Sequence, residues 1–260
     1  MLKRFPLWGL AILITLNLLA GCGTPEAIAP LDLEAIKSQM DAGEVDTALK
    51  ALEAAVKQEP QNAEAYFLLG VAYFKTGAYE KAREAFNETL DLDPERAAAV
   101  HHNLGALAIQ VEDLDTAVTE FKTALEIEPD DPDTHYQLGA AYLLQSLPTD
   151  ETSAPLEDKL VLAREEFERA WELAPGKAEV LVGLGNVHLL EGNLAQATEV
   201  LEQAVTTAPE MPEALFALGR LYALTNDFDG AREMLQRCLA ANPPEVWAQQ
   251  AQELLDMLGE

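Results

Sequence analysis

Apolar residues along this chain recur at helical spacing, in stretches that end at regularly spaced prolines. Proline ends a helix because it lacks an amide hydrogen and its ring clashes with the preceding turn. Six such prolines follow one another at intervals of 34, 35, 46, 34 and 34 residues: Pro60, Pro94, Pro129, Pro175, Pro209 and Pro243. The pattern therefore predicts an array of equal units, each made of a helix, a turn and a second helix.

The packing residues come into register when the units are aligned on their prolines. In residues 63–96 the first helix carries Gly70, and the second helix carries Ala82 and Phe86. Glycine and alanine allow two helix backbones to approach, and larger side chains fill the remaining space. The first unit departs from the pattern, with Ile36 at the glycine position. The later units keep the glycine: Gly105, Gly139, Gly185 and Gly219.

The period and these packing residues resemble the tetratricopeptide repeat family over residues 29–243. The resemblance implies an all-α fold, a right-handed α-solenoid in which residues 31–243 form six helix-turn-helix units and residues 244–260 form a capping helix. It also implies a chain that binds other proteins and is not an enzyme.

The longest interval places an insertion at about residues 143–162, in the fourth unit. Polar residues bracketed by Pro148 and Pro155 predict a loop. The second helix of this unit is expected to be longer than the others, with four residues on one apolar face: Leu156, Leu160, Ala163 and Phe167. The insertion is either a second contact site or a tolerated surface loop.

Residues 1–21 have the features of a secretion signal. Lys3 and Arg4 precede an uncharged stretch that ends in Leu-Ala-Gly-Cys, which resembles a bacterial lipoprotein signal peptide and its lipobox. The resemblance implies that Cys22 carries lipid and that residues 22–30 are a short tether. The alternative is an uncleaved membrane anchor, but the apolar stretch is short for a span of about 20 residues.

Lipid on Cys22 predicts attachment to a membrane of the bacterial cell envelope, because two or more acyl chains hold a protein stably at a bilayer. Gly23 follows the cysteine. In a Gram-negative source this residue resembles the pattern for sorting to the outer membrane, and the protein would then face the periplasm.

The chain carries 45 acidic and 17 basic residues, for a formal net charge of −28. Cleavage after residue 21 would make it −30, because Lys3 and Arg4 are lost with no acidic residue. Nucleic acid and anionic lipid headgroups are poor partners for such a surface. The acidic residues are either the solvated faces of helices or a surface for a basic partner.

No constellation typical of catalysis occurs, and no cofactor, metal or small-molecule substrate is expected. The acidic turn at residues 130–133 lacks the central glycine of a calcium loop, and helix capping explains it better. Cys238 stands at a small-residue position of the repeat and is expected to be a packing residue. The chain contains four histidines: His101, His102, His135 and His188.

The family resemblance implies that positions 5, 9 and 12 of each first helix line a concave inner groove. These positions lie on one helical face, and here they are mostly apolar. They suit an amphipathic helix or an extended apolar peptide, although part of the stripe is alternatively buried between adjacent helices. The candidate groove residues are Phe67, Val71, Phe74, His102, Ile109, Tyr136, Leu143, Val182, Asn186, Leu189, Phe216 and Arg220.

In outline the chain resembles tetratricopeptide lipoproteins of Gram-negative outer membranes, and type IV pilus pilotins match best in length. The resemblance implies a membrane-tethered scaffold that binds another envelope protein during assembly of a larger complex. The alternative is a substrate or regulatory adaptor for an envelope peptidase or hydrolase. No short motif ties the chain to pili.

Overall fold

The computed structural model describes residues 32–148 and 154–259. The predicted signal peptide at residues 1–21, the lipidated Cys22 and the tether at residues 22–30 lie outside the described residues. Within them, no helix is long and apolar enough to cross a membrane.

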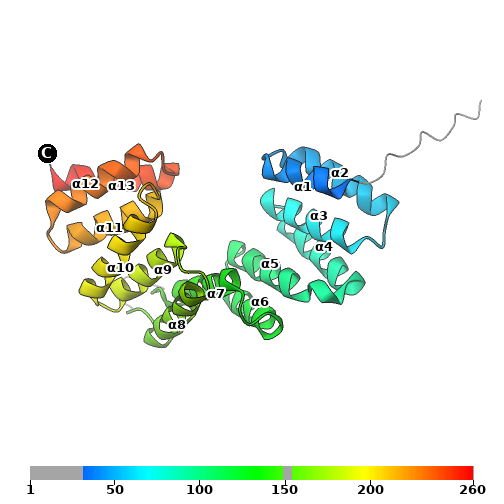
Figure 1. Cartoon of the computed structure of the whole chain (residues 1–260), viewed down its shortest axis with the longest axis horizontal. Helices are drawn as coiled ribbons and strands as arrows, with labels where there is room; N and C mark the ends of the chain where they lie inside the picture. Colours follow the sequence, from blue (N-terminus) through cyan, green and yellow to red (C-terminus); the bar gives the residue numbers. More distant parts are fainter. Residues whose placement is uncertain (1–31, 149–153, 260) are drawn as a thin grey trace, which may run out of the picture. The chain divides into compact units, whose positions relative to one another are not determined.

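The described residues form thirteen α-helices and one short 3-10 helix, and they contain no strand. The all-α solenoid prediction is therefore confirmed, and the helix pairs follow one another in chain order (Figure 1). The helices are α1 (Leu33–Asp41), α2 (Val45–Gln58), α3 (Ala63–Lys75), α4 (Tyr79–Leu92), η1 (Pro94–Arg96), α5 (Ala97–Gln110), α6 (Leu114–Ile127), α7 (Pro132–Ser146), α8 (Glu157–Leu173), α9 (Ala178–Leu190), α10 (Leu194–Thr207), α11 (Pro212–Leu224), α12 (Phe228–Ala240) and α13 (Glu245–Leu258).

The helices are arranged in two layers. Each first helix of a unit contacts the first helix of the next unit, in an unbroken series from α1 to α13. The second helices contact the first helices on either side, but among the described residues no two second helices contact each other. The odd-numbered helices therefore form an inner layer, and the even-numbered helices from α2 to α12 form an outer layer.

In units two to six, the crossing of the helix pair depends on a glycine that faces a large side chain. A Cβ atom added at Gly70 would lie 2.6 Å from the ring of Phe86, and one at Gly105 would lie 2.7 Å from Phe121. Both rings are fully buried. Only glycine leaves room for an aromatic ring at this approach, which explains why these residue types share a register.

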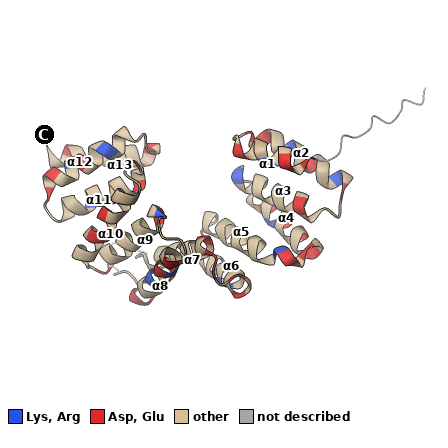
Figure 2. Cartoon of the chain, viewed as in Figure 1, with Lys and Arg blue, Asp and Glu red and all other residues tan. Residues whose placement is uncertain are grey.

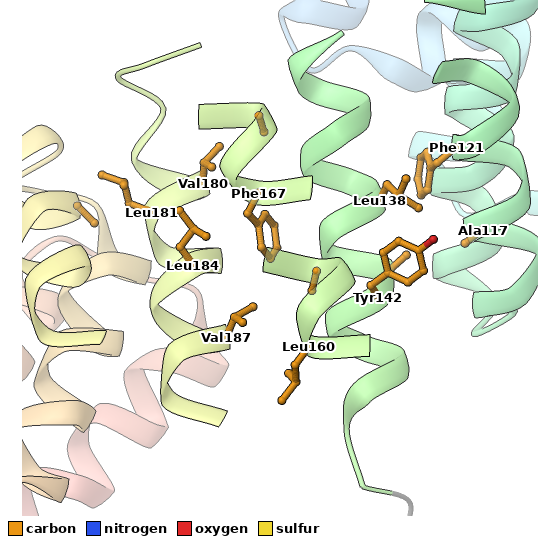
Figure 3. Close-up of a cluster of buried hydrophobic side chains, with 14 of the residues drawn as sticks. Ala117, Phe121, Leu138, Tyr142, Leu160, Phe167, Val180, Leu181, Leu184 and Val187 are labelled. Atoms are coloured by element: carbon orange, nitrogen blue, oxygen red, sulfur yellow. The ribbon is translucent and has the colours of Figure 1, made fainter. Parts of the chain in front are cut away.

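Phe167 lies in a core cluster that extends from the third unit to the sixth (Figure 3). A Cβ atom added at Gly139 of its own unit would lie 3.0 Å from its ring, and one at Gly183 of the next unit would lie 2.7 Å from it. Its ring stands between Leu138 and Tyr142 of α7 and a group of α9 side chains that includes Leu184. One side chain thus joins two successive units.

Turns between the helices of a unit use a residue in the left-handed region of φ. Gly43, Gly77 and Gly192 occupy this position in three units, and Asn226 occupies it in the sixth. In the third unit the residue is Glu112, with φ of 60°. A side chain other than glycine or asparagine is strained in this conformation.

The fourth unit replaces this turn with a longer connection. Helix α7 continues to Ser146, residues 147–156 connect the two helices, and α8 has 17 residues, against 13 or 14 in every other second helix. Leu160 and Phe167 are buried on α8 as predicted, but Leu156 is not on the helix. It is the N-cap residue, its backbone is extended with φ of −76° and ψ of 107°, and it is 52% exposed.

The two ends of the array differ. In the first unit, Ile36 and Leu52 stand where the second unit has Gly70 and Phe86, and both are buried. At the other end, α13 packs on α11 and α12. Ala251 is fully buried there, and the ring of Trp247 stacks on Phe216 with 6.0 Å between ring centres.

Candidate binding surface

The candidate groove residues all lie on first helices of units two to six. Eleven of them are half-buried, and Arg220 is exposed. Each is thus in contact with the array and also accessible from outside. They lie on α3 (Phe67, Val71, Phe74), α5 (His102, Ile109), α7 (Tyr136, Leu143), α9 (Val182, Asn186, Leu189) and α11 (Phe216, Arg220).

Two of the four aromatic members, Phe67 and Tyr136, rest on buried rings of the core. The centre of the Phe67 ring lies 6.0 Å from that of Phe86, and Tyr136 lies 5.7 Å from Phe167. Tilted pairs at these separations are favourable arrangements. Core packing holds these two inner rings, and because both residues are only half-buried, part of each remains available to a bound polypeptide.

Polar contacts join neighbouring first helices across this surface. His102 Nδ1 lies 2.7 Å from Thr134 Oγ1 and links α5 to α7. Asn186 Oδ1 accepts a hydrogen bond from Arg220 Nη2 at 3.3 Å and links α9 to α11. Burial lowers the pKa of His102, so the imidazole is neutral at neutral pH.

Charge is distributed unevenly along the inner layer. Near the N-terminal end, Glu64 forms ion pairs with Lys37, at 2.8 Å, and with Arg96. Near the C-terminal end, Glu179 and Glu213 form no ion pair with any described residue. Burial raises the pKa of the Tyr136 hydroxyl, and these two carboxylates raise it further. Acidic residues recur along the array with fewer lysines and arginines between them (Figure 2).

The remaining candidate groups form contacts within the fold. Asp131 is the N-cap of α7, where its carboxylate accepts from the Thr134 amide at 3.0 Å, so the capping interpretation of the acidic turn is confirmed. Cys238 is fully buried, and its thiol donates to the Pro212 carbonyl at 3.4 Å. In the part of the chain that the structure describes, no three potential ligands are grouped as a metal site.

Histidines at equivalent places in two units each contact a glutamate. His101 Nδ1 lies 2.6 Å from Glu120 Oε2, and His135 Nδ1 lies 2.6 Å from Glu166 Oε2. Each pair joins the first helix of a unit to the second helix of the same unit. They are repeated packing contacts on the side of the first helix that faces the outer layer.

The structure shows how the inner contacts cross from unit to unit, which the sequence did not predict. The Asn186 and Arg220 pair, the His102 and Thr134 pair and the Phe216 and Trp247 stack each join successive first helices. Two of these contacts join residues 32 and 34 positions apart, close to one repeat period. Complementary residue types one period apart are the signal that would have identified them.

Models of the tetratricopeptide repeat match most of the described chain. One matches residues 33–97 and 162–212, a second matches 188–255, and a model described as TPR repeat matches 109–146. Repeats of this family are generally protein-interaction modules without catalysis, and the concave faces of stacked repeats are binding surfaces.

The similar proteins share the architecture at low identity. The BBSome complex member BBS4 of Bos taurus is 30% identical to this chain over 147 residues. The match spans 26% of the length of that relative. The structure of PilW, a widely conserved type IV pilus biogenesis factor, has a TM-score of 0.70 and 18% identity, covering 84% of this chain and 96% of PilW. The structure of Pseudomonas aeruginosa PilF has a TM-score of 0.66 and 19% identity, covering 85% and 95%. On the repeat matches, this chain belongs to the tetratricopeptide repeat family.

Proposed function

We propose that the protein is a non-catalytic scaffold, anchored in the bacterial cell envelope by lipid on Cys22, that binds a segment of another envelope protein. The observation that carries the proposal is the series of half-exposed apolar and aromatic side chains on five consecutive first helices. Aromatic residues fixed by packing are typical anchors of protein interfaces, because little entropy is lost when they are covered.

The envelope part of the proposal rests on the resemblance of residues 1–22 to a lipoprotein signal peptide. It is supported by the similarity in fold and length to PilW and PilF. The proposed role in assembly of an envelope complex is supported by an inner surface that extends over several units, because such a surface suits a long segment of a second chain.

Binding at the inner layer is tested by placing charge on it without removing its rings. Val71→Glu combined with Leu189→Glu puts a carboxylate at the middle of α3 and near the end of α9. The matched control is Ile127→Glu at the end of the outer helix α6, where Ile127 is 48% exposed. Wild type, the inner variant and the control are each used to recover cross-linked partners from membranes of the source organism.

We expect wild type and control to recover one partner equally. The inner variant should recover roughly ten-fold less of it, which corresponds to about 1.4 kcal/mol of binding free energy. Equal recovery by the inner variant, with melting temperatures unchanged, excludes this surface as the binding site. A pore or pilus subunit as the partner supports assembly, whereas a hydrolase points to the adaptor role.

Replacement of Cys22 by serine is expected to release the protein from the membrane fraction, and continued sedimentation with membranes contradicts the lipid anchor.

A further inference from the structure

A hollow lies at the turns of units three and four. Its volume is about 430 Å³, and its apolar lining comprises Leu114, Leu144, Leu147 and Leu156. Leu114 begins α6, Leu144 lies near the end of α7, and the other two lie at the two ends of the insertion. The candidate groove residues of the inner layer do not line it.

These leucines are unusually accessible. Leu144 is 41% exposed, Leu147 is 43% exposed and Leu156 is 52% exposed. Scattered exposed apolar residues are common on protein surfaces, whereas neighbouring exposed apolar side chains with a polar rim are typical of interaction sites. Residues 147–156 have no equivalent in the other units, so the exposed leucines at the ends of this connection belong to the fourth unit alone.

Hydrogen bonds hold this lining in place. The Leu156 amide donates to the Ser146 carbonyl at 2.9 Å, and the Leu147 amide donates to the Leu144 carbonyl at 3.2 Å. The Ser146 side chain is buried and donates to the Leu143 carbonyl at 2.6 Å. The ends of the connection are thus joined to each other and to α7. A surface fixed in this way loses little conformational entropy when it binds.

The rim of the hollow is acidic. Glu112, Asp113 and Asp115 line it, against one cation, Lys159. The Lys159 ammonium already lies 5.6 Å from the centre of the Tyr142 ring. Glu112 keeps a left-handed backbone at a place where three other units have glycine, and strained residues of this kind cluster at functional sites.

We propose that this hollow binds an amphipathic helix of a partner protein that combines leucine-like and basic side chains. The apolar face of such a helix would cover Leu144, Leu147 and Leu156, and its lysines or arginines would lie beside the three carboxylates. Helices bind apolar grooves in this way in many complexes. The acidic rim repels an anionic bilayer and so favours a basic polypeptide. This surface is additional to the inner one.

The probe is a synthetic amphipathic peptide of leucine and lysine that carries one photoreactive leucine, with a second peptide in which glutamate replaces every lysine. The full chain in detergent is compared with Leu147→Ser combined with Leu156→Ser. The matched control is Val246→Ser combined with Met257→Ser on α13, where these residues are 64% and 74% exposed. A charge variant, Glu112→Asn, keeps a residue that tolerates the left-handed conformation.

We expect the lysine peptide to cross-link beside Leu144 and to bind the leucine variant at least roughly ten-fold more weakly than the α13 control. Glu112→Asn should weaken binding several-fold at low salt and less at high salt, since the attraction is screened. Cross-linking elsewhere, equal binding of the glutamate peptide, or equal affinity for the leucine variant would overturn the proposal. So would leucine-dependent binding to anionic phospholipid vesicles in place of the peptide.

Discussion

Units two and four have the same helix crossing but different turns. In unit two Gly70 faces Phe86, and Gly77 closes a short turn with φ of 76°. In unit four Gly139 faces Phe167 in the same register, but residues 147–156 replace the turn. The contact that fixes each helix pair lies in the middle of the helices. A turn can therefore be lengthened at small entropic cost and acquire new side chains without disturbing the core.

The two rings also differ in what they join. Phe86 packs against Phe67 of its own unit and clusters with Val100 and Leu104 of the next, whereas Phe167 packs between glycines of two successive units. Phe167 thus connects the unit with the altered turn to the next unit. Rigid packing beside an irregular connection is typical of binding surfaces, because the scaffold holds the loop in position.

The largest effect is expected from removing the ring of Phe167, which packs between two units. Phe167→Ala is expected to lower the free energy of unfolding by about 3–5 kcal/mol, since it leaves a cavity between α7, α8 and α9. Urea denaturation followed by circular dichroism measures the loss. Phe228→Ala is the control, because Phe228 is 45% exposed, and equal losses in the two variants would contradict the role assigned to Phe167.

A smaller effect is expected from adding a methyl group at the two crossings. Gly70→Ala places a Cβ 2.6 Å from the buried Phe86 ring and is expected to destabilise by about 1–3 kcal/mol, reduced by the better helix propensity of alanine. Gly139→Ala places its Cβ 3.0 Å from the Phe167 ring and 3.2 Å from the Ala163 carbonyl oxygen, and it should cost less because its closest contact is longer. Thermal melts of the two variants test the order, and a larger loss at Gly139 would show that the fourth crossing is the tighter one.

Substitutions at two turn residues are expected to change the free energy of unfolding by about 1 kcal/mol, in opposite directions. Glu112→Gly is expected to stabilise the fold, because glycine adopts a positive φ without strain, and Gly77→Glu is expected to destabilise it. Chemical denaturation of both variants measures the change. If Glu112→Gly is destabilising, the glutamate side chain has a stabilising contact that outweighs its backbone strain.

The smallest effect concerns pH at the contact between units three and four. Burial lowers the pKa of His102, opposed by the carboxylates of Asp131 and Asp133. The unfolded chain therefore binds a proton more strongly than the folded one, and stability falls as pH drops below the ordinary value of about 6.5. Above that value both states are neutral and His102 adds no pH dependence.

His102→Gln should consequently show a smaller loss of stability than wild type between about pH 7.5 and about pH 5.5. Thermal melts at both values, in the same ionic strength, give the comparison. An identical loss in the two proteins would assign the acid sensitivity to other groups.

The sequence alone determined the fold because the repeat enforces it. The proline, the glycine and the large apolar residue represented by Pro60, Gly70 and Phe86 recur in units two to six, and local rules for helix ends and helix crossings predict the helix pairs. The stripe of half-exposed inner residues also followed from the repeat positions. Its binding role, the lipid on Cys22 and the envelope location stay predictions.

Only the tertiary structure decided what the fourth unit does with its extra residues. Helical spacing placed Leu156 with Leu160 on one buried face, but Leu156 precedes the helix and lines a hollow with Leu147 and Leu114. Periodicity along one segment reports which residues share a helix face. It holds no information on where a connection folds back or which side chains from a neighbouring unit it meets, because those contacts depend on hydrogen bonds and packing between distant residues.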